Sequence, residues 1–333
     1  MQLRFLILTI LLLLAAAPQA QAAPPDLRAE LAQGEKALAA RDYPAAYAAY
    51  ARHAGTNPLA AFTLGLFEQQ GWGRPVDPKA ACAWFDQAAQ RNIPAAQQLF
   101  GDCLAQGIGR AADGPAAVRW YRQAAAAGIS YALCSAGDLY IAGTLLPRDV
   151  AQGLALCTTA AQAESPPAML KLADYYREGT RVPPNARLAR FWYDQAAQRH
   201  NHEAQFRLGV MLSEGEGGAA DPALARFWLE HAATEGYAPA YLPTAILYAN
   251  AAVDPATGAL APNDLAKIYM WNQAAKAADT DSANAAKPGA TARLAEIARI
   301  DALVAAVMPS QWQPALDRRV AEHLSKFSST PRH

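Results

Sequence analysis

The chain has 333 residues, of which 53% are apolar and 17% charged, and its formal net charge is zero. This composition supports a folded core and gives no sign of disorder. The balanced charge, with no run of Lys or Arg, argues against a nucleic-acid ligand, because a basic surface is needed to follow phosphates.

The N-terminus carries a pattern typical of a secretory signal. Arg4 precedes an apolar run from Phe5 to Ala17, and Ala20-Gln21-Ala22 supplies a small-x-small cleavage site. The run is too short to span a bilayer. We therefore expect a cleavable signal peptide over residues 1–22 and a mature protein that is periplasmic or secreted, without stable membrane insertion. An uncleaved membrane anchor is the alternative.

Residues 26–58 predict a helical hairpin. Tyr43, Tyr47 and Tyr50 share one helical face, and Asp42 precedes the second helix as an N-cap. The hairpin looks like a tetratricopeptide hairpin. We expect it to cap the first of the repeats that follow, because a terminal repeat must replace a missing neighbour.

Five segments of 36 residues follow one another from Leu59 to Ala238. Each has an alanine pair at the same place: Ala88-Ala89, Ala124-Ala125, Ala160-Ala161, Ala196-Ala197 and Ala232-Ala233. A fixed period of this size predicts a solenoid of stacked repeats.

Each segment predicts two helices separated by a glycine stop. The first helix ends at a glycine that can adopt the left-handed conformation: Gly71, Gly107, Gly143, Gly179 or Gly215. The second helix begins after an Asp or Asn cap in four segments: Asp77, Asp149, Asn185 and Asp221. We expect four tryptophans of the second helices to supply the large buried surface between helices: Trp84, Trp120, Trp192 and Trp228.

The pattern LG…G-x-G…WY/WF…AA, strongest in Leu64–Ala89 and Leu208–Ala233, resembles the Sel1-like repeat family, a relative of the tetratricopeptide repeats. The third segment departs most, with Ala136-Gly137 for the Leu-Gly pair and Leu156-Cys157 for the Trp-aromatic pair. The resemblance implies an all-α fold. We therefore expect a right-handed α/α superhelical solenoid of Sel1-like, tetratricopeptide-like helix pairs with terminal capping helices.

Six repeats are expected in the solenoid: 59–94, 95–130, 131–166, 167–202, 203–238 and 239–279. The sixth has a lengthened loop, and its Trp271 fits either of the two aromatic positions. Residues 280–292 are small and polar and predict a flexible linker. Residues 293–327 predict two amphipathic helices, which in similar Sel1-like proteins close the solenoid.

The four cysteines occupy paired places in the repeat frame. Cys134 and Cys157 are nearly equidistant from the turn inside the third repeat, and Cys82 and Cys103 from the turn between the first two repeats. Both pairs are candidate disulfides in an oxidising compartment. Against this, helix axes usually lie roughly 8–10 Å apart, further than a disulfide tolerates. The alternative is four buried free thiols.

No sequence motif of a hydrolase is present. Some Sel1-like proteins have been associated with penicillin binding or hydrolysis, but this chain lacks S-x-x-K, S-D-N, K-T-G, G-x-S-x-G and H-E-x-x-H. His200 and His202 fall at a predicted turn, where solvated side chains are expected in preference to a metal site. We therefore expect no catalytic residue, no metal and no cofactor.

The first helices present rows of residues at equivalent positions. The most regular row is Asp102, Asp138 and Asp174. We expect a partner-binding surface on the concave face, made of Leu66, Gln70, Leu99, Asp102, Gln106, Asp138, Lys171, Asp174, Glu178, Arg207 and Glu214. Charge reversal at the three aspartates should then abolish partner capture and leave thermal unfolding nearly unchanged. The alternative is that these residues are polar only because they are exposed to solvent.

These features together predict an exported interaction scaffold, adaptor or regulator of the cell envelope. Its partner would be an envelope protein or peptide bound on the concave face, and it would have no chemistry of its own. The alternative is a protein that binds or hydrolyses β-lactams or peptidoglycan fragments.

Overall fold

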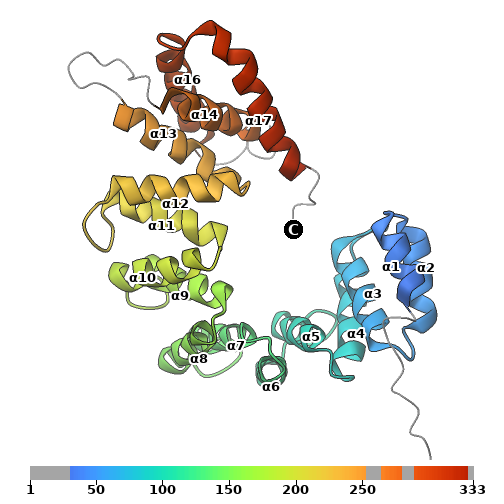
Figure 1. Ribbon diagram of the computed structural model, residues 1–333. Coiled ribbons are helices and arrows are strands. Elements are labelled where there is room, and N and C mark those ends of the chain that lie inside the picture. The colour runs from blue at the N-terminus through green and yellow to red at the C-terminus, as the bar shows by residue number, and fades with distance from the viewer. Residues whose placement is uncertain (1–30, 253–263, 280–288, 329–333) are drawn as a thin grey trace, which may run out of the picture. The chain divides into compact units, whose positions relative to one another are not determined.

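The computed structural model describes residues 31–252, 264–279 and 289–328, and every regular element within these ranges is helical (Figure 1). The predicted signal peptide at 1–22 lies outside them, as does most of the predicted linker. The chain divides into two compact units, residues 1–96 and residues 97–333. Each unit is described by itself below.

In the first unit, two hairpins pack around one phenylalanine. The ring of Phe67 lies 6.4 Å from that of Tyr43, 5.7 Å from Tyr47 and 6.2 Å from Tyr50, measured between centroids. The tyrosine face of the first hairpin therefore covers the first helix of the first repeat. The helices are α1 (Ala32–Ala39), α2 (Tyr43–His53), α3 (Pro58–Gln70) and α4 (Pro78–Ala89).

The second unit is a stack of helix pairs. Within it, α7–α8, α9–α10 and α11–α12 form hairpins, and each second helix also packs on the first helix of the next pair. Figure 1 shows α7 and α9 on the inner side of the curve that these helices follow, with α8 and α10 on the outer side. The helices are α5 (Pro94–Gln106), α6 (Gly114–Ala126), α7 (Ala132–Ala142), α8 (Val150–Gln162), α9 (Pro166–Glu178), α10 (Ala186–Gln198), α11 (His202–Glu214) and α12 (Pro222–Thr234).

The predicted helix ends are confirmed. The five glycines that follow the first helices have φ angles of +65° to +72°, in the left-handed region. The side chains of Asp77, Asp149, Asn185 and Asp221 each accept hydrogen bonds from backbone N–H groups in the first turn of the second helix. Because four N–H groups at a helix start have no partner within the helix, these caps fix where each second helix begins.

The expectation that the tryptophans supply the buried surface is wrong by one residue. Trp84, Trp120, Trp192 and Trp228 are only partly buried. The residue after each of them is 3% exposed or less: Phe85, Tyr121, Tyr193 and Leu229. The buried residues of α4 include Ala81, Phe85 and Ala88, which follow the i, i+4, i+7 spacing, so the tryptophan lies at the edge of the stripe.

Three of these buried side chains, Phe85, Tyr121 and Leu229, pack on a glycine of the first helix, and in the fourth repeat Ala173 takes the place of that glycine. A Cβ atom on Gly65 would lie 2.4 Å from the Phe85 ring, and one on Gly101 would lie 2.7 Å from the Tyr121 ring. Real Cβ contacts are not that close, so a side chain at these positions would separate the two helices. The glycine therefore allows the ring to lie directly against the backbone of the first helix.

The two helices of the third repeat pack in a different way. A Cβ atom on Gly137 would lie 2.4 Å from the backbone oxygen of Gly153, and one on Gly153 would lie 2.6 Å from that of Gly137. With no side chain between them, α7 and α8 come close enough for Cys134 and Cys157 to form a disulfide, with a Cα–Cα distance of 3.9 Å. None of the four cysteines is a free thiol. The pairing of Cys82 with Cys103 stays a prediction.

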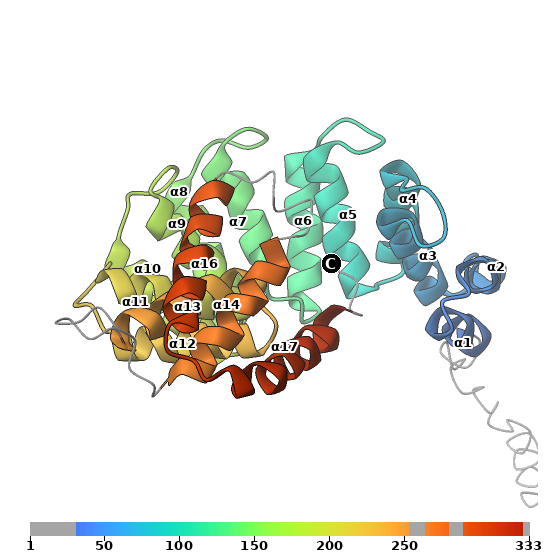
Figure 2. The same ribbon diagram turned by 90° about the horizontal axis from the view of Figure 1, so that it is seen from above.

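The sixth pair consists of α13 (Tyr241–Ala252) and α14 (Leu265–Asp279). Trp271 is 1% exposed and stacks on Tyr241 at 5.9 Å, so it takes the buried aromatic position, and the ambiguity of register is removed. The helices α16 (Ala290–Ala305) and α17 (Gln313–Ser328) both pack on α14, as Figure 2 also shows.

The boundary predicted at residue 293 is too late. Helix α16 begins at Ala290, after Gly289 in the left-handed conformation, so residues 290–292 belong to the helix and not to a linker. The guanidinium of Arg293 bonds the Asp279 carboxylate at 3.1 Å and ties the start of α16 to the end of α14. Among the described residues, no helix is long and apolar enough to cross a bilayer.

The third hairpin gives a first prediction. Replacing Gly153 by Ala places a methyl group 2.6 Å from the Gly137 oxygen and 2.5 Å from Ile141. We expect Gly153→Ala to lower the free energy of unfolding by ~1–3 kcal/mol, the usual cost of overpacking, and to reduce the yield of the Cys134–Cys157 disulfide. Thermal unfolding and non-reducing peptide mass spectrometry measure these effects.

Gly55→Ala is the matched control, because nothing lies within 4 Å of its added methyl group. Equal stability of the Gly153→Ala variant and wild type would contradict the account of the third hairpin.

Candidate functional site

The three predicted aspartates lie together on the first helices of the second unit, Asp102 on α5, Asp138 on α7 and Asp174 on α9. We call them the aspartate row. Each accepts a hydrogen bond from a tyrosine hydroxyl. The oxygen–oxygen distances are 2.7 Å from Tyr121 to Asp102, 2.5 Å from Tyr175 to Asp138 and 2.6 Å from Tyr193 to Asp174.

Two of these pairs join the helices of a single repeat. Tyr121 on α6 reaches Asp102 on α5, and Tyr193 on α10 reaches Asp174 on α9. Because the tyrosine ring lies across the first helix, its hydroxyl emerges beside the carboxylate. The tyrosine therefore links the core of the repeat to its polar face.

The chain itself contains the apolar version of this pair. In the first repeat the equivalent positions hold Leu66 and Phe85, and in the fifth they hold Val210 and Leu229. In the first, second, fourth and fifth repeats, an aspartate thus occurs where the facing residue has a hydroxyl, and an aliphatic residue where it has none. Burial of a hydroxyl without a partner is costly, which explains why the two positions change together.

The third repeat keeps its aspartate without a tyrosine of its own. Cys157 occupies the position of that tyrosine, and its sulfur is in the disulfide. The hydroxyl for Asp138 comes instead from Tyr175, on the first helix of the next repeat. The Lys171 ammonium adds an ion pair to Asp138 at 3.0 Å. This aspartate therefore joins two repeats.

Two cations, Lys171 and Arg207, pair with the row. The Arg207 guanidinium bonds Asp174 at 2.9 Å and also pairs with Glu203. Burial raises the pKa of Tyr131, which lies close enough to Lys171 and to all three aspartates for their charges to act on it as well. Tyr131 therefore lies within electrostatic reach of all three aspartates.

Burial sets the protonation of these groups. It raises the pKa of Asp102 and of Asp174, although the tyrosine hydrogen bonds oppose the shift. Burial and the neighbouring carboxylates raise the pKa of Tyr121, Tyr175 and Tyr193. The hydroxyls are therefore protonated donors at neutral pH and are not poised as nucleophiles.

A polar hollow of about 300 Å³ lies at the end of the row. Its lining combines two cations, two carboxylates and two hydroxyl side chains: Lys171, Asp174, Tyr175, Glu178, Thr180 and Arg181. It suits a polar or charged side chain of a partner better than an apolar one. No group of three His, Cys, Asp or Glu side chains that could hold a metal occurs among the described residues.

The other predicted binding residues differ in exposure. Gln106, Glu178 and Glu214 are exposed, and Leu99 is partly buried, all in the second unit. Leu66, partly buried, and Gln70, exposed, belong to the first unit. We call the surface that carries the residues of the second unit the first-helix face.

We predicted that charge reversal in the aspartate row would leave thermal unfolding nearly unchanged. This geometry does not support that prediction. Each aspartate holds a hydroxyl whose ring is buried, so a lysine there would remove a core hydrogen bond as well as a surface charge. Sequence reasoning missed the tyrosines as partners of the row. The signal was present, because Tyr121 and Tyr193 replace Phe85 and Leu229 in the repeats that carry the aspartate.

A double-mutant cycle tests the tyrosine–aspartate pair. Tyr121→Phe leaves the Asp102 carboxylate desolvated without its donor, and we expect a loss of ~1–3 kcal/mol in the free energy of unfolding. Tyr121→Phe with Asp102→Leu copies the apolar pair of the first repeat and should recover most of the loss. Denaturant unfolding measures the coupling energy.

Tyr140→Phe is the control, since the Tyr140 hydroxyl has no hydrogen bond in the part of the chain that the structure describes. Additive effects in the cycle, with no recovery in the double variant, would show that the pair is not coupled.

The raised pKa of Asp102 gives a pH-dependent prediction. The folded state holds the Asp102 proton more tightly than the unfolded state, so ionisation of this carboxyl destabilises the fold above its raised pKa. Asp102→Asn removes that ionisation and keeps an oxygen for Tyr121. We expect the variant to gain stability relative to wild type at neutral pH and the gain to shrink as the pH falls through the carboxyl's pKa. A gain that grows on acidification would refute this. Thermal unfolding as a function of pH measures it.

The family comparison supports the repeats described above. The Sel1 repeat model matches residues 58–93, 94–129, 130–165, 166–201 and 202–237, more than half of the chain and one residue earlier than the frame used above. The sixth pair is not matched. No curated protein matched the chain.

Two solved structures share the fold. A Sel1 repeat protein from Oxalobacter formigenes is 26% identical, with a TM-score of 0.55 over 74% of this chain and 99% of that one. The protective antigen c5321 of uropathogenic Escherichia coli, which has an SLR fold, is 23% identical, with a TM-score of 0.54 over 82% of this chain and 62% of that one. The five matched repeats and these likenesses agree with the helix pairs described above, and the chain belongs to the Sel1 repeat family.

Proposed function

We propose that the protein is an exported interaction scaffold of the cell envelope and that it binds a partner segment along the first-helix face. Sel1 repeats generally mediate protein–protein interaction, which supports the scaffold role. Export rests on the sequence pattern of residues 1–22. A regulator that holds one partner and releases it would use the same surface.

The observation that carries the proposal is the polar hollow at the end of the aspartate row. It lies on α9 and the turn that follows, where Lys171, Glu178 and Arg181 offer charges of both signs around about 300 Å³. A partner side chain that enters it meets groups already held in place by the aspartate–tyrosine bonds. Such preorganisation lowers the ordering cost of binding.

The surface around the hollow has a net acidic character. Glu178 and Glu214 are exposed and occupy equivalent positions on α9 and α11, and Gln106 takes that position on α5. Lys171 and Arg207, in contrast, are already paired with Asp138 and Asp174. The hollow also holds one exposed cation, Arg181. The two exposed carboxylates of Glu178 and Glu214 outnumber it, so the unpaired charge of the first-helix face is negative, and we propose a partner with basic residues in the bound segment.

The experiment is affinity capture from envelope extracts with the double variant Glu178→Lys, Glu214→Lys. We expect it to lose the captured partner, because the surface charge changes sign. Thermal unfolding should stay within about 0.5 kcal/mol of wild type, since both residues are exposed. Mass spectrometry identifies and quantifies what is bound.

A variant with the same change in net charge elsewhere, Glu235→Lys with Glu322→Lys, is the control, because both glutamates are exposed and belong to the end of α12 and to α17, not to a first helix. Unchanged capture by the Glu178, Glu214 variant would refute binding on the first-helix face. Loss of capture by the control variant alone would also refute it.

A further inference from the structure

The second helices of the fourth and fifth repeats expose a strip of apolar side chains. The sequence LARFW occurs at residues 188–192 and again at 224–228. Phe191 is 50% exposed and Phe227 is 53% exposed, and the leucine three residues before each of them is also exposed. We call these four side chains the LARFW strip: Leu188, Phe191, Leu224 and Phe227. Single exposed apolar residues are ordinary, but a group at equivalent positions is a mark of an interaction surface.

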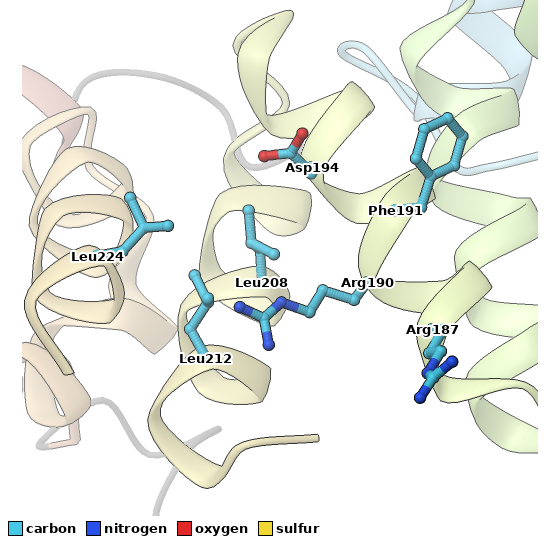
Figure 3. A pocket seen from close by; sticks show the side chains of 7 residues that line it. All are labelled: Arg187, Arg190, Phe191, Asp194, Leu208, Leu212 and Leu224. Carbon is cyan, nitrogen blue, oxygen red and sulfur yellow. The ribbon is translucent and has the colours of Figure 1, made fainter. Parts of the chain in front are cut away.

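A hollow lies between Phe191 and Leu224 of the strip, as Figure 3 shows. Its volume is about 330 Å³. Phe191 of α10 and Leu224 of α12 stand on its two sides, and Leu208 and Leu212 of α11, which are 2% and 1% exposed, close it from within. The hollow therefore has apolar walls on three helices and has room for an apolar side chain of a partner.

Two arginines stand beside the apolar walls. Arg187 is exposed and forms no ion pair within the described residues, and Arg190 donates to a neutral group, the backbone carbonyl of Ala219, at 3.0 Å. One carboxylate, Asp194, also lines the hollow; it accepts a bond from the amide of Gln198 at 2.7 Å and lies within electrostatic reach of Arg190. The hollow thus carries an excess of positive charge next to exposed apolar surface.

We propose that the LARFW strip is a second docking surface, which binds a partner segment that presents an apolar side chain with carboxylates beside it. The apolar side chain enters the hollow between Phe191 and Leu224, and the carboxylates face Arg187 and Arg190. Aromatic and arginine side chains of this kind are the ones that carry most binding energy at interfaces. The surface is separate from the first-helix face and does not depend on it.

A second copy of the chain fits this surface less well. If two LARFW strips faced each other, the arginines of one copy would approach those of the other, and like charges in contact oppose association. An acidic segment removes that repulsion. The charge around the hollow therefore favours an acidic partner over self-association.

The test uses a fluorescein-labelled amphipathic helical peptide, with Leu and Phe one helical turn apart on one face and Glu beside them. A second peptide with Lys in place of Glu is its matched counterpart. Fluorescence anisotropy of each peptide, titrated with the full chain, gives the affinities. We expect the acidic peptide to bind at least about tenfold more tightly than the basic one, with affinity falling as salt rises.

Variants of the protein locate the binding. Phe191→Ala with Phe227→Ala, and separately Arg187→Glu, should each weaken the acidic peptide about tenfold, a difference of ~1.4 kcal/mol. Arg119→Glu with Arg122→Glu, two exposed arginines on α6, should leave the affinity within about twofold of wild type after correction for net charge. Thermal unfolding confirms that every variant is folded.

The proposal is overturned if both peptides bind equally, if neither binds, or if the α6 variant weakens binding as much as Arg187→Glu. It is also overturned if sedimentation shows a dimer of the wild type that Phe191→Ala with Phe227→Ala converts to a monomer, because the strip would then be an interface between copies. Loss of envelope capture in the Glu178, Glu214 variant, with peptide binding intact, would separate this surface from the first-helix face.

Discussion

The structure depends on one contact that recurs within the repeats, a glycine of the first helix beneath a large side chain of the second. A side chain in place of Gly65 or Gly101 would overlap the ring that lies on it. The two helices therefore approach until the ring meets backbone. The ring then extends across the first helix, so the atom at the end of the ring determines which residue type the first helix needs beside it. A phenylalanine tip needs an apolar neighbour, and a tyrosine tip needs an acceptor.

The third repeat shows how far this arrangement can change without losing the stack. Cysteine replaces the ring at position 157, glycine replaces the usual alanine at position 153, and the hairpin closes to disulfide distance. Asp138 would then lack a donor, and Tyr175 of the following repeat supplies one. A contact made inside other repeats is made here between two repeats. The covalent bond and the inter-repeat hydrogen bond thus compensate for one missing ring.

The first-helix face and the LARFW strip differ in how many of their side chains already have partners within the chain. On the first-helix face, most charged groups pair with one another, so recognition rests on the few that remain exposed, such as Glu178. At the LARFW strip, Arg187 forms no ion pair within the described residues, and Arg187 and the half-exposed ring of Phe191 flank a hollow. Electrostatic matching generally sets specificity and association rate, whereas buried aromatic contacts set affinity. The two surfaces are accordingly suited to different tasks.

The sequence by itself determined the period, the glycine stops, the caps and therefore the family, because these depend on contacts between residues close in the chain. Asp77 caps a helix two and three residues away, and Gly71 ends one by its own φ angle. Only the tertiary structure decided that Phe85 and not Trp84 is buried, because one residue turns a helix by about 100° and the pattern tolerates either phase. It also decided that the aspartate row serves buried hydroxyls, since Tyr175 and Asp138 meet only when two repeats stack. Local geometry is encoded along the chain, whereas the rotation of each helix about its axis is fixed by what it packs against.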